Sequence, residues 1–446
     1  MSSIPPTGLR PGTLALICEL KEVIFKQTGN QDFIGAGGLH VSIPTYAWYG
    51  DLPLKLELPD EWDVVEHRMA GHDAPALTKD QIRSKLARPV GSKPLGEIAK
   101  DRKECVILVD DLTRPTKASQ VIPQILDELH QAGMKNDHVR FVMATGAHHW
   151  MRLEDLRKKL GDDIPDRYHV YNHNVYENNT FLGNTSRGTP VHVNREVMSC
   201  DLKIAVGCII PHMSLGFGGG GKIVLPGVAS IETITHNHGD ITEGAQVGSV
   251  ERNARRLDAE EAAAMASLDF VVNVLVNPNR DTCDLVCGDF VAAHRAGVRL
   301  ARSHYLTDVT KADVIIVNGY PMENEAYKVF DIIEQSLNND GDALIIIHTP
   351  EGARGHYYNG RFGTNYGGKG WVPGGYLPAS LRTKSFYVLA PHSSLADNQY
   401  FGLNSRWVKS WNEALRELWT KHSTTGVKVV VYPYAPMQIP EDNLES

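Results

Sequence analysis

The sequence contains four clusters of side chains that could do chemistry near neutral pH. They are Asp110-Asp111-Leu112-Thr113-Arg114, Gly146-Ala147-His148-His149, the run from Pro211-His212 to Lys222, and Thr235-His236-Asn237-His238-Gly239. Histidine exchanges protons close to its ordinary pKa of about 6.5 and also binds metals. Arginine holds a carboxylate or a phosphate through two parallel hydrogen bonds. The residue types therefore favour acid–base chemistry on an anionic ligand, although each cluster alone could equally be a helix cap, a surface ion pair or a solvated histidine.

The third cluster has the most distinctive pattern. Gly216 to Lys222 fit the first seven positions of the phosphate-binding loop G-x-x-x-x-G-K, but the Ser or Thr that should hold Mg²⁺ is replaced by Ile223. Pro226 also breaks the helix that such a loop should open. A phosphate-loop ATPase or kinase is therefore disfavoured. What remains is a glycine backbone beside a lysine, which allows a bulky ligand to approach closely.

The elements that must position these residues are typical of an α/β protein, with largely parallel sheets flanked by helices. Apolar runs predict strands at 105–109, 139–143, 202–207, 270–275, 314–317, 343–347 and 427–431, and amphipathic stretches predict helices at 118–132, 253–265, 289–301, 325–337 and 411–419. The polar clusters follow predicted strands, and ligands of open α/β sheets bind at the carboxyl ends of strands. Pro115 and Thr116 are expected to begin a helix with Arg114 at its mouth. His236 and His238 alternate, so only one of them should face a site.

The length of 446 residues predicts two domains. We expect an N-terminal cofactor-binding and catalytic domain over 1–305, with the tail 432–446 as its candidate completion, and a C-terminal α/β domain over 306–431. The active site should lie in the cleft between them. The first hundred residues are less regular and should include a small antiparallel β portion. The Gly- and Tyr-rich tract from Gly352 to Gly375 is expected to form a long surface or active-site loop.

The composition excludes several classes of protein. Lys plus Arg is 45 and Asp plus Glu is 53, so the formal charge is −8, which argues against a nucleic-acid partner. No apolar stretch is long enough to span a membrane, and no secretory signal is visible, so we expect a cytoplasmic protein. The six cysteines are scattered, which favours free thiols. The oligomeric state cannot be inferred from these features.

Together, the clusters resemble the lactate racemase family that uses the nickel-pincer nucleotide, in which one carbon and two sulfur atoms of a nicotinate-derived cofactor hold nickel. The resemblance rests on four motifs: D-x-T-R-P-T at 111–116, G-x-H at 146–148, P-H-x-x-x-G-F-x-G-G-x-K at 211–222 with V-L-P-G after it, and N-H at 237–238. It covers about residues 105 to 330. A looser match at 319–328 is similar to the block of the family's second domain.

The resemblance implies a role for each matching residue. The cofactor would be pyridinium-3,5-bisthiocarboxylic acid mononucleotide nickel, made by separate cofactor-biosynthesis proteins and tethered covalently to Lys222. His238 would be the fourth ligand of nickel, which accepts imidazole beside sulfur. The remaining implied roles are an acid–base pair in His148 and His212, substrate-binding cations in Arg114 and Lys328, and a cofactor lining of Asp111, Thr113, Gly218 and Gly219.

The activity that the resemblance implies is racemisation or 2-epimerisation of a small anionic 2-hydroxy acid. Hydride would pass from C2 to the cofactor and back, through a 2-keto acid, while the two histidines handle the hydroxyl proton. The chain departs from the family at His149 and Gly221, where an arginine is common. Because two cations are lost, a substrate other than lactate is our hypothesis.

Two other readings stay open beside the phosphate-loop enzyme. A zinc-dependent hydrolase could use His148, His149, His212 and His238, although the sequence lacks a compact ligand motif such as H-E-x-x-H. A protein that carries nickel or the cofactor without turnover would fit if the substrate cations are truly missing.

Overall fold

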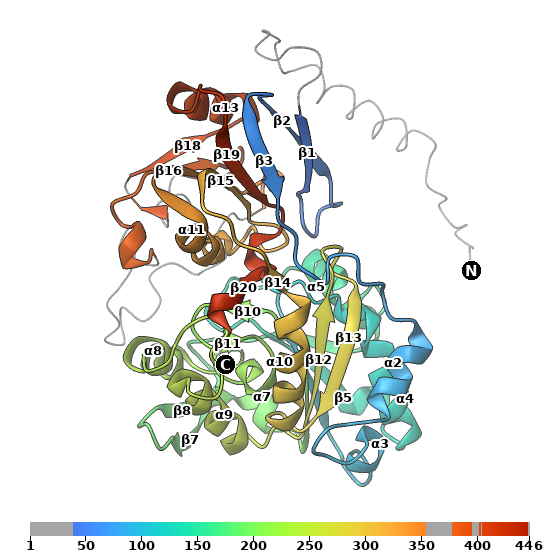
Figure 1. The fold of residues 1–446 in the computed structure, drawn as a ribbon. Helices are drawn as coiled ribbons and strands as arrows, with labels where there is room; N and C mark the ends of the chain where they lie inside the picture. Colours follow the sequence, from blue (N-terminus) through green and yellow to red (C-terminus); the bar gives the residue numbers. More distant parts are fainter. Residues whose placement is uncertain (1–38, 354–376, 395–400, 403, 445–446) are drawn as a thin grey trace, which may run out of the picture.

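The computed structural model describes residues 39–353, 377–394, 401, 402 and 404–444, and its strands form two six-stranded sheets (Figure 1). The first sheet has the order β13-β12-β9-β4-β5-β6 and is parallel except for β13. Its strands are β4 (Cys105–Asp110), β5 (Val139–Ala144), β6 (His169–Asn172), β9 (Leu202–Cys208), β12 (Phe270–Val276) and β13 (Thr282–Gly288).

Helices cover both faces of the first sheet. Successive residues of β4 alternate between two cores, with Ile107 and Val109 in one and Val106 and Leu108 in the other. Strands buried on both faces read as continuous apolar runs, which is why the sequence reveals them so clearly. The surrounding helices are α2 (Lys79–Leu86), α3 (Leu95–Ile98), α4 (Ile122–Gln131), α5 (Leu153–Leu160), α6 (Ile164–Arg167), α7 (Arg195–Met198), α8 (Ile231–Thr235), α9 (Ala254–Met265) and α10 (Ala292–His304).

The second sheet has the order β18-β17-β16-β15-β19-β3 and is parallel throughout. Its strands are β3 (Trp62–Glu66), β15 (Ala312–Asn318), β16 (Leu337–Ile346), β17 (Phe386–Leu389), β18 (Ser405–Val408) and β19 (Val427–Tyr432). One face packs on α11 (Phe330–Ser336), and the other packs on α13 (Trp411–Lys421) and on the hairpin of β1 (Leu39–Pro44) and β2 (Pro53–Leu58). The predicted fold class is therefore confirmed.

Most of the predicted elements are also confirmed. The seven predicted strands and five predicted helices are present within a few residues, and the β1-β2 hairpin is the expected antiparallel portion. In the segment 325–337, a 3₁₀ turn over Ala326–Val329 precedes α11. Short pairs complete the described part: β7 (Asn179–Asn184) with β8 (Pro190–Asn194), and β10 (Pro211–His212) with β11 (Gly216–Phe217). The tract from Gly352 to Gly375 lies, from residue 354 on, outside the described residues.

One expected boundary is wrong, because the helix after β4 begins at Ile122 and not at Pro115. The buried Asp110 carboxylate accepts a hydrogen bond from Thr116 Oγ1 at 2.7 Å. The Lys159 ammonium donates to the carbonyl oxygens of Arg114 and Thr116, both at 2.9 Å. These contacts bind carbonyl oxygens that would accept hydrogen bonds within a helix. Arg114 therefore lies on a loop held by Lys159 and not at the N-terminus of a helix.

Both ends of the described chain cross from one sheet to the other. Residues 39–66, which the sequence placed with the first domain, lie in the upper body of Figure 1, where β3 pairs with β19. The chain returns at its other end, where β20 (Ile439–Pro440) pairs with β14 (Leu306–Thr307) and Met437 joins the core of the first sheet. The local hydrophobic pattern predicts a strand but not the strand it pairs with. The pairing of β3 with β19 and of β20 with β14 could therefore not be predicted from the sequence. In the described residues, no helix is long and apolar enough to cross a membrane.

Candidate active site

The four polar clusters meet at one cavity of about 400 Å³ beside the carboxyl ends of β4, β5 and β9. Parallel strands end at the same edge of a sheet, so loops distant in sequence converge there. Tyr327, from the segment before α11, adds a wall from the second domain. The predicted site residues that line the cavity are Asp111, Thr113, Arg114, His148, His212, Gly218, Gly219, Lys222 and His238. Lys328 lies next to this wall and reaches the same polar network through Glu325.

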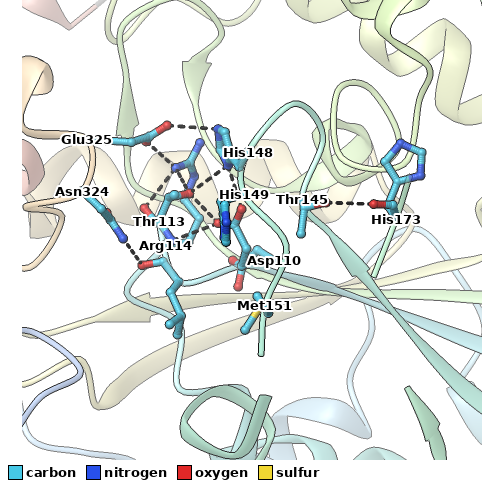
Figure 2. Close-up of polar contacts among 12 residues, drawn as sticks. Asp110, Thr113, Arg114, Thr145, His148, His149, Met151, His173, Asn324 and Glu325 are labelled. Atoms are coloured by element: carbon cyan, nitrogen blue, oxygen red, sulfur yellow. Dashed lines mark hydrogen bonds and ion pairs between the residues drawn. The ribbon is translucent and has the colours of Figure 1, made fainter. Parts of the chain in front are cut away.

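His148 is held between two carboxylates (Figure 2). Its Nδ1 lies 2.7 Å from Asp111 Oδ2, and its Nε2 lies 3.2 Å from Glu325 Oε1. Asp111 is fixed in turn, because its Oδ1 accepts hydrogen bonds from the backbone N–H and the hydroxyl of Thr113. Burial opposes the charged ring, but the two carboxylates outweigh it and raise the pKa of His148 above its ordinary value.

His212 has the opposite environment. It is buried at the end of the β10 strand, and its Nδ1 accepts hydrogen bonds from the backbone N–H groups of Ser214 at 3.3 Å and Leu215 at 3.2 Å. Burial, and then the positive charges of Lys222, Lys328 and Arg114, lower the pKa of His212 well below its ordinary value. The neutral ring therefore carries its proton on Nε2.

Glu325 is the central residue of the site that sequence reasoning missed. Its Oε2 lies 2.6 Å from Arg114 Nη1 and forms an ion pair with the Lys328 ammonium, while its Oε1 accepts a hydrogen bond from Tyr327 Oη at 3.2 Å. The carboxylate is 1% exposed, so its contacts replace water completely. Both predicted substrate cations are thus already paired with a carboxylate. The one signal in the sequence was an acidic residue three positions before Lys328 in the looser motif.

The loop Gly216 to Lys222, called the glycine cradle below, has no room for side chains at its glycine positions. A Cβ on Gly218 would lie 2.8 Å from Cys208 O, and one on Gly219, at φ +78°, would lie 2.7 Å from Asn273 Oδ1. The buried Arg256 guanidinium donates to the carbonyl oxygens of Leu215, Phe217 and Gly219, and a ring nitrogen of His294 lies 2.9 Å from Gly218 O. Neither Arg256 nor His294 belongs to a motif, so these two supports could not be predicted from the sequence.

Lys222 and His238 both line the cavity, and the pKa of each is lowered there. Burial, and then the positive charges of Arg114 and Lys328, lower the pKa of Lys222 well below its ordinary value. Burial followed by the Arg255 charge does the same to the pKa of His238. The neutral form of an amine is the one that can be acylated, and the neutral form of an imidazole is the one that binds a metal.

A turn of π-helix, His236–Asp240, carries His238. Asn237 anchors this turn by donating to Asp258 Oδ2 at 2.7 Å, and the Arg255 guanidinium donates to the His238 carbonyl oxygen at 2.7 Å. Within the described residues, His238 Nδ1 is buried without a hydrogen-bond partner. His236 instead bonds to Thr189 Oγ1 at 2.8 Å, so one histidine of the pair faces the cavity, as expected.

The arrangement leaves the two alternative enzyme classes with little support. Nowhere in the described ranges do three or more His, Cys, Asp or Glu side chains gather as a metal-binding group. A zinc hydrolase, which needs such a group, is therefore not favoured. The loop at Gly216–Lys222 continues into a short 3₁₀ turn over Gly220–Ile223 and not into the long helix of a phosphate-binding loop.

The fold and the site define an α/β protein in which two histidines and a buried arginine line one cavity at the carboxyl ends of a largely parallel sheet. Residues 49–248 match the family described as lactate racemase N-terminal domain. The chain is 29% identical over 317 residues to lactate racemase from Thermoanaerobacterium thermosaccharolyticum, covering 69% of this chain and 74% of the relative. It is 28% identical over 293 residues to lactate racemase from Lactiplantibacillus plantarum, covering 63% and 69%. The resemblance to lactate racemases that the motifs predicted is confirmed, and the chain is an isomerase of the racemase class.

Solved structures support the same fold. The lactate racemase apoprotein from T. thermosaccharolyticum superposes with a TM-score of 0.69 at 23% identity, over 90% of this chain and 100% of that chain. A protein from Thermotoga maritima superposes with a TM-score of 0.61 at 18% identity, over 82% of this chain and 98% of that chain.

Proposed function

We propose that the protein is a racemase or 2-epimerase of a small 2-hydroxy acid and that it works with a covalently tethered nickel-pincer nucleotide. One observation carries the proposal: two histidines line a single cavity with their pKa values shifted in opposite directions, beside two buried cations. Such a pair can accept and donate a proton at the same pH.

The residues around the cavity fit the cofactor. The glycine cradle admits a bulky group, the neutral Lys222 amine can form the tether, and the orphaned imidazole of His238 can complete the coordination of a metal. A single protein ligand suffices for an ion that the nucleotide already holds through carbon and sulfur. When bound, the nucleotide supplies the acceptor and donor for the C2 hydride.

Arg114 and Lys328 bind and orient the substrate. Both are buried and face the same carboxylate oxygen of Glu325, so a second carboxylate can share the two cations. Burial, and then the Arg114 charge, lower the pKa of Lys328 to about 8 despite the opposing effect of Glu325. Lys328 is therefore still largely charged near neutral pH. Held in this way, a 2-hydroxy acid keeps its C2 in one place while its configuration changes.

The two histidines move the hydroxyl proton. Asp111 accepts the Nδ1 proton of His148, so Nε2, which lies 3.2 Å from Glu325 Oε1, is the atom that would take or give the substrate proton beside that carboxylate. His212 presents its Nε2 proton to the cavity, since backbone N–H groups occupy Nδ1. It can accept a proton at Nε2 only in the other tautomer, in which Nδ1 carries the proton and gives up these two contacts. The two rings come from different strands, so each can serve one configuration of the substrate.

The two departures from the family suggest a substrate other than lactate. The His149 ring turns to Trp150, whose Nε1 lies 2.6 Å from His149 Nε2. A Cβ at Gly221 would lie 3.0 Å from the Ala263 methyl and 3.2 Å from Glu260 Cα, so an arginine there would need the helix α9 to move. Cations at these two positions are therefore replaced, and the substrate has fewer charged partners.

The direct test is a screen of enantiopure 2-hydroxy acids, including sugar acids. The protein is produced together with cofactor-biosynthesis proteins, loaded with nickel, and the products are separated by chiral chromatography. Conversion of one configuration at C2 into the other supports the proposal. If nickel-loaded protein converts none of the acids, the catalytic part of the proposal is wrong, and a cofactor carrier without turnover takes its place.

Replacement of either histidine tests the acid–base assignment. We expect His148→Ala and His212→Ala each to lower kcat by about 10² to 10⁴, the usual contribution of a positioned acid or base. Nickel content, measured by elemental analysis, should stay unchanged. His130→Asn, which alters a surface histidine paired with Asn136, is the control and should keep full activity. Undiminished racemisation by both alanine variants would exclude this pair.

A further inference from the structure

We infer that Glu325 selects the charge of the substrate and restricts the site to 2-hydroxy acids with a single carboxylate. This inference rests on the proposed function and assigns a role to a residue that lies in the looser match at 319–328 but was given no role by it. Figure 2 shows Glu325 facing both Arg114 and His148. It is a specificity-determining residue because its own carboxylate already supplies the negative charge that a second carboxylate of the substrate would otherwise bring to Arg114 and Lys328.

The contacts show that Glu325 remains in place when substrate arrives. Its Oε2 binds Arg114 and Lys328, and its Oε1 lies 3.2 Å from both His148 Nε2 and Tyr327 Oη. A carboxylate with four partners and 1% exposure has no route to water that would compensate for losing them. The substrate carboxylate therefore joins the two cations beside Glu325 and does not displace it.

Charge balance then limits the substrate. Among the groups that contact Glu325, Arg114 and Lys328 contribute two positive charges against the one negative charge of Glu325, while His148 is paired with Asp111. One substrate carboxylate neutralises this set, whereas a second carboxylate beside Glu325 would find no further arginine or lysine among the described groups that contact it. In a buried site the repulsion between that second carboxylate and Glu325 acts over several ångströms, so it penalises a dicarboxylate in any orientation.

The test compares two acids of nearly equal shape, 2-hydroxybutyrate and malate, which differ in a methyl group against a carboxylate. The holoenzyme is assayed for kcat/KM with each acid, and binding of each is measured by titration calorimetry. The variants are Glu325→Gln and the control Glu323→Gln. Glu323 is also buried and lies in the same segment, but it accepts a hydrogen bond from Ala47 N–H and contacts neither His148 nor the two cations.

We expect the unaltered enzyme to prefer 2-hydroxybutyrate, and Glu325→Gln to raise the ratio of malate to 2-hydroxybutyrate by about tenfold or more. Glu323→Gln should leave this ratio unchanged. An unchanged ratio in folded Glu325→Gln protein would overturn the inference. Equal use of both acids by the unaltered enzyme would also overturn it, even if the variant does not fold.

The two proposals can fail separately. If no 2-hydroxy acid is converted, the proposed function is wrong, and the calorimetric preference between the two acids still decides whether Glu325 selects charge. If acids are converted but the ratio does not respond to Glu325→Gln, the proposed function stands and the role of Glu325 is refuted.

Discussion

At the scale of single residues, His148 and His212 differ in what holds their ring nitrogens. A carboxylate accepts from Nδ1 of His148, and backbone N–H groups donate to Nδ1 of His212. The first contact stabilises an imidazolium and the second stabilises a neutral ring. The pKa values of two histidines in one cavity are thereby shifted in opposite directions without any change in residue type.

Asp111→Asn should move the pH profile of the enzyme. Loss of the carboxylate lowers the pKa of His148, because Asp111 is its main stabilising partner. When His148 acts as a base, the ascending limb of kcat/KM moves to lower pH. When His148 acts as an acid, the descending limb also moves to lower pH. The profile is measured with both enantiomers of the substrate.

A matched control for this prediction lies in the second domain. Asp342 Oδ2 is 2.8 Å from His422 Nε2, a buried Asp–His pair that does not line the cavity. Asp342→Asn removes the same kind of contact and should leave the profile unchanged. An equal shift in both variants would show that the effect does not come from His148.

Two buried lysines of the site should respond differently to substitution. Lys222→Ala is expected to abolish the covalently attached cofactor mass, which intact-protein mass spectrometry measures, because no amine remains to form the tether. Lys328→Met should retain that mass and instead raise KM by about tenfold or more, since a charge-assisted hydrogen bond is worth about 1.5 to 3 kcal/mol. Retained mass in Lys222→Ala would refute the tether.

At the scale of elements, the loop from Gly216 to Lys222 replaces a helix by a glycine cradle. Gly216 has φ +73°, and a Cβ there would lie 1.8 Å from Ser249 O, a backbone atom that cannot rotate away. The loop contains only the two-residue strand β11 and a short 3₁₀ turn, and Arg256 and His294 supply partners for the carbonyl oxygens of Phe217, Gly218 and Gly219. Its shape is therefore set by supports from α9 and α10.

Gly216→Ala should damage this cradle more than a change of backbone preference alone. We expect a loss of about 1 to 3 kcal/mol in the free energy of unfolding from backbone strain, together with reduced attachment of the cofactor. Gly426→Ala is the control, because Gly426 has a similar φ of +80° but no atom within 4 Å of its Cβ position. Denaturant unfolding and mass spectrometry compare the two. Equal stability losses would show that the close approach to Ser249 has no effect.

At the scale of the whole molecule, the loop between β1 and β2 joins the second domain to the first. Trp48 Nε1 donates to Leu112 O at 3.1 Å, next to the residues that hold His148. The Arg280 guanidinium, from the turn after β12, binds both carboxylate oxygens of Asp51 at 2.5 and 2.7 Å and lies 4.7 Å from the centre of the Trp48 ring. These contacts fix the two walls of the cavity relative to one another.

Asp51→Asn tests this connection. The Arg280 side chain is only 4% exposed, so it would keep a buried charge without its carboxylate. We expect the free energy of unfolding to fall by about 1 to 3 kcal/mol. Asp63→Asn, at an exposed position of β3, is the control and should stay within about 0.5 kcal/mol of the unaltered protein. A loss no larger than that of the control would show that the pair does not hold the domains together.

The sequence by itself determined the strands and most of the side chains that we propose to react. Strands such as β4 and β9 are buried on both faces, so they appear as continuous apolar runs whatever surrounds them. His148, His212, Lys222 and His238 lie in short motifs whose letters suffice to identify them. Their convergence followed from the rule that parallel strands end at one edge of a sheet.

Only the tertiary structure decided how these residues are paired. Glu325 meets Arg114 across 211 residues, and Arg256 supports Gly219 from another helix. The placement of β3 beside β19 is a contact of the same long-range kind. Such long-range contacts do not change the hydrophobic periodicity of the sequence, because that periodicity depends only on the helix or strand in which each residue lies. The charge state of each histidine, and with it the direction of proton transfer, depends on these partners and could not be predicted from residue type.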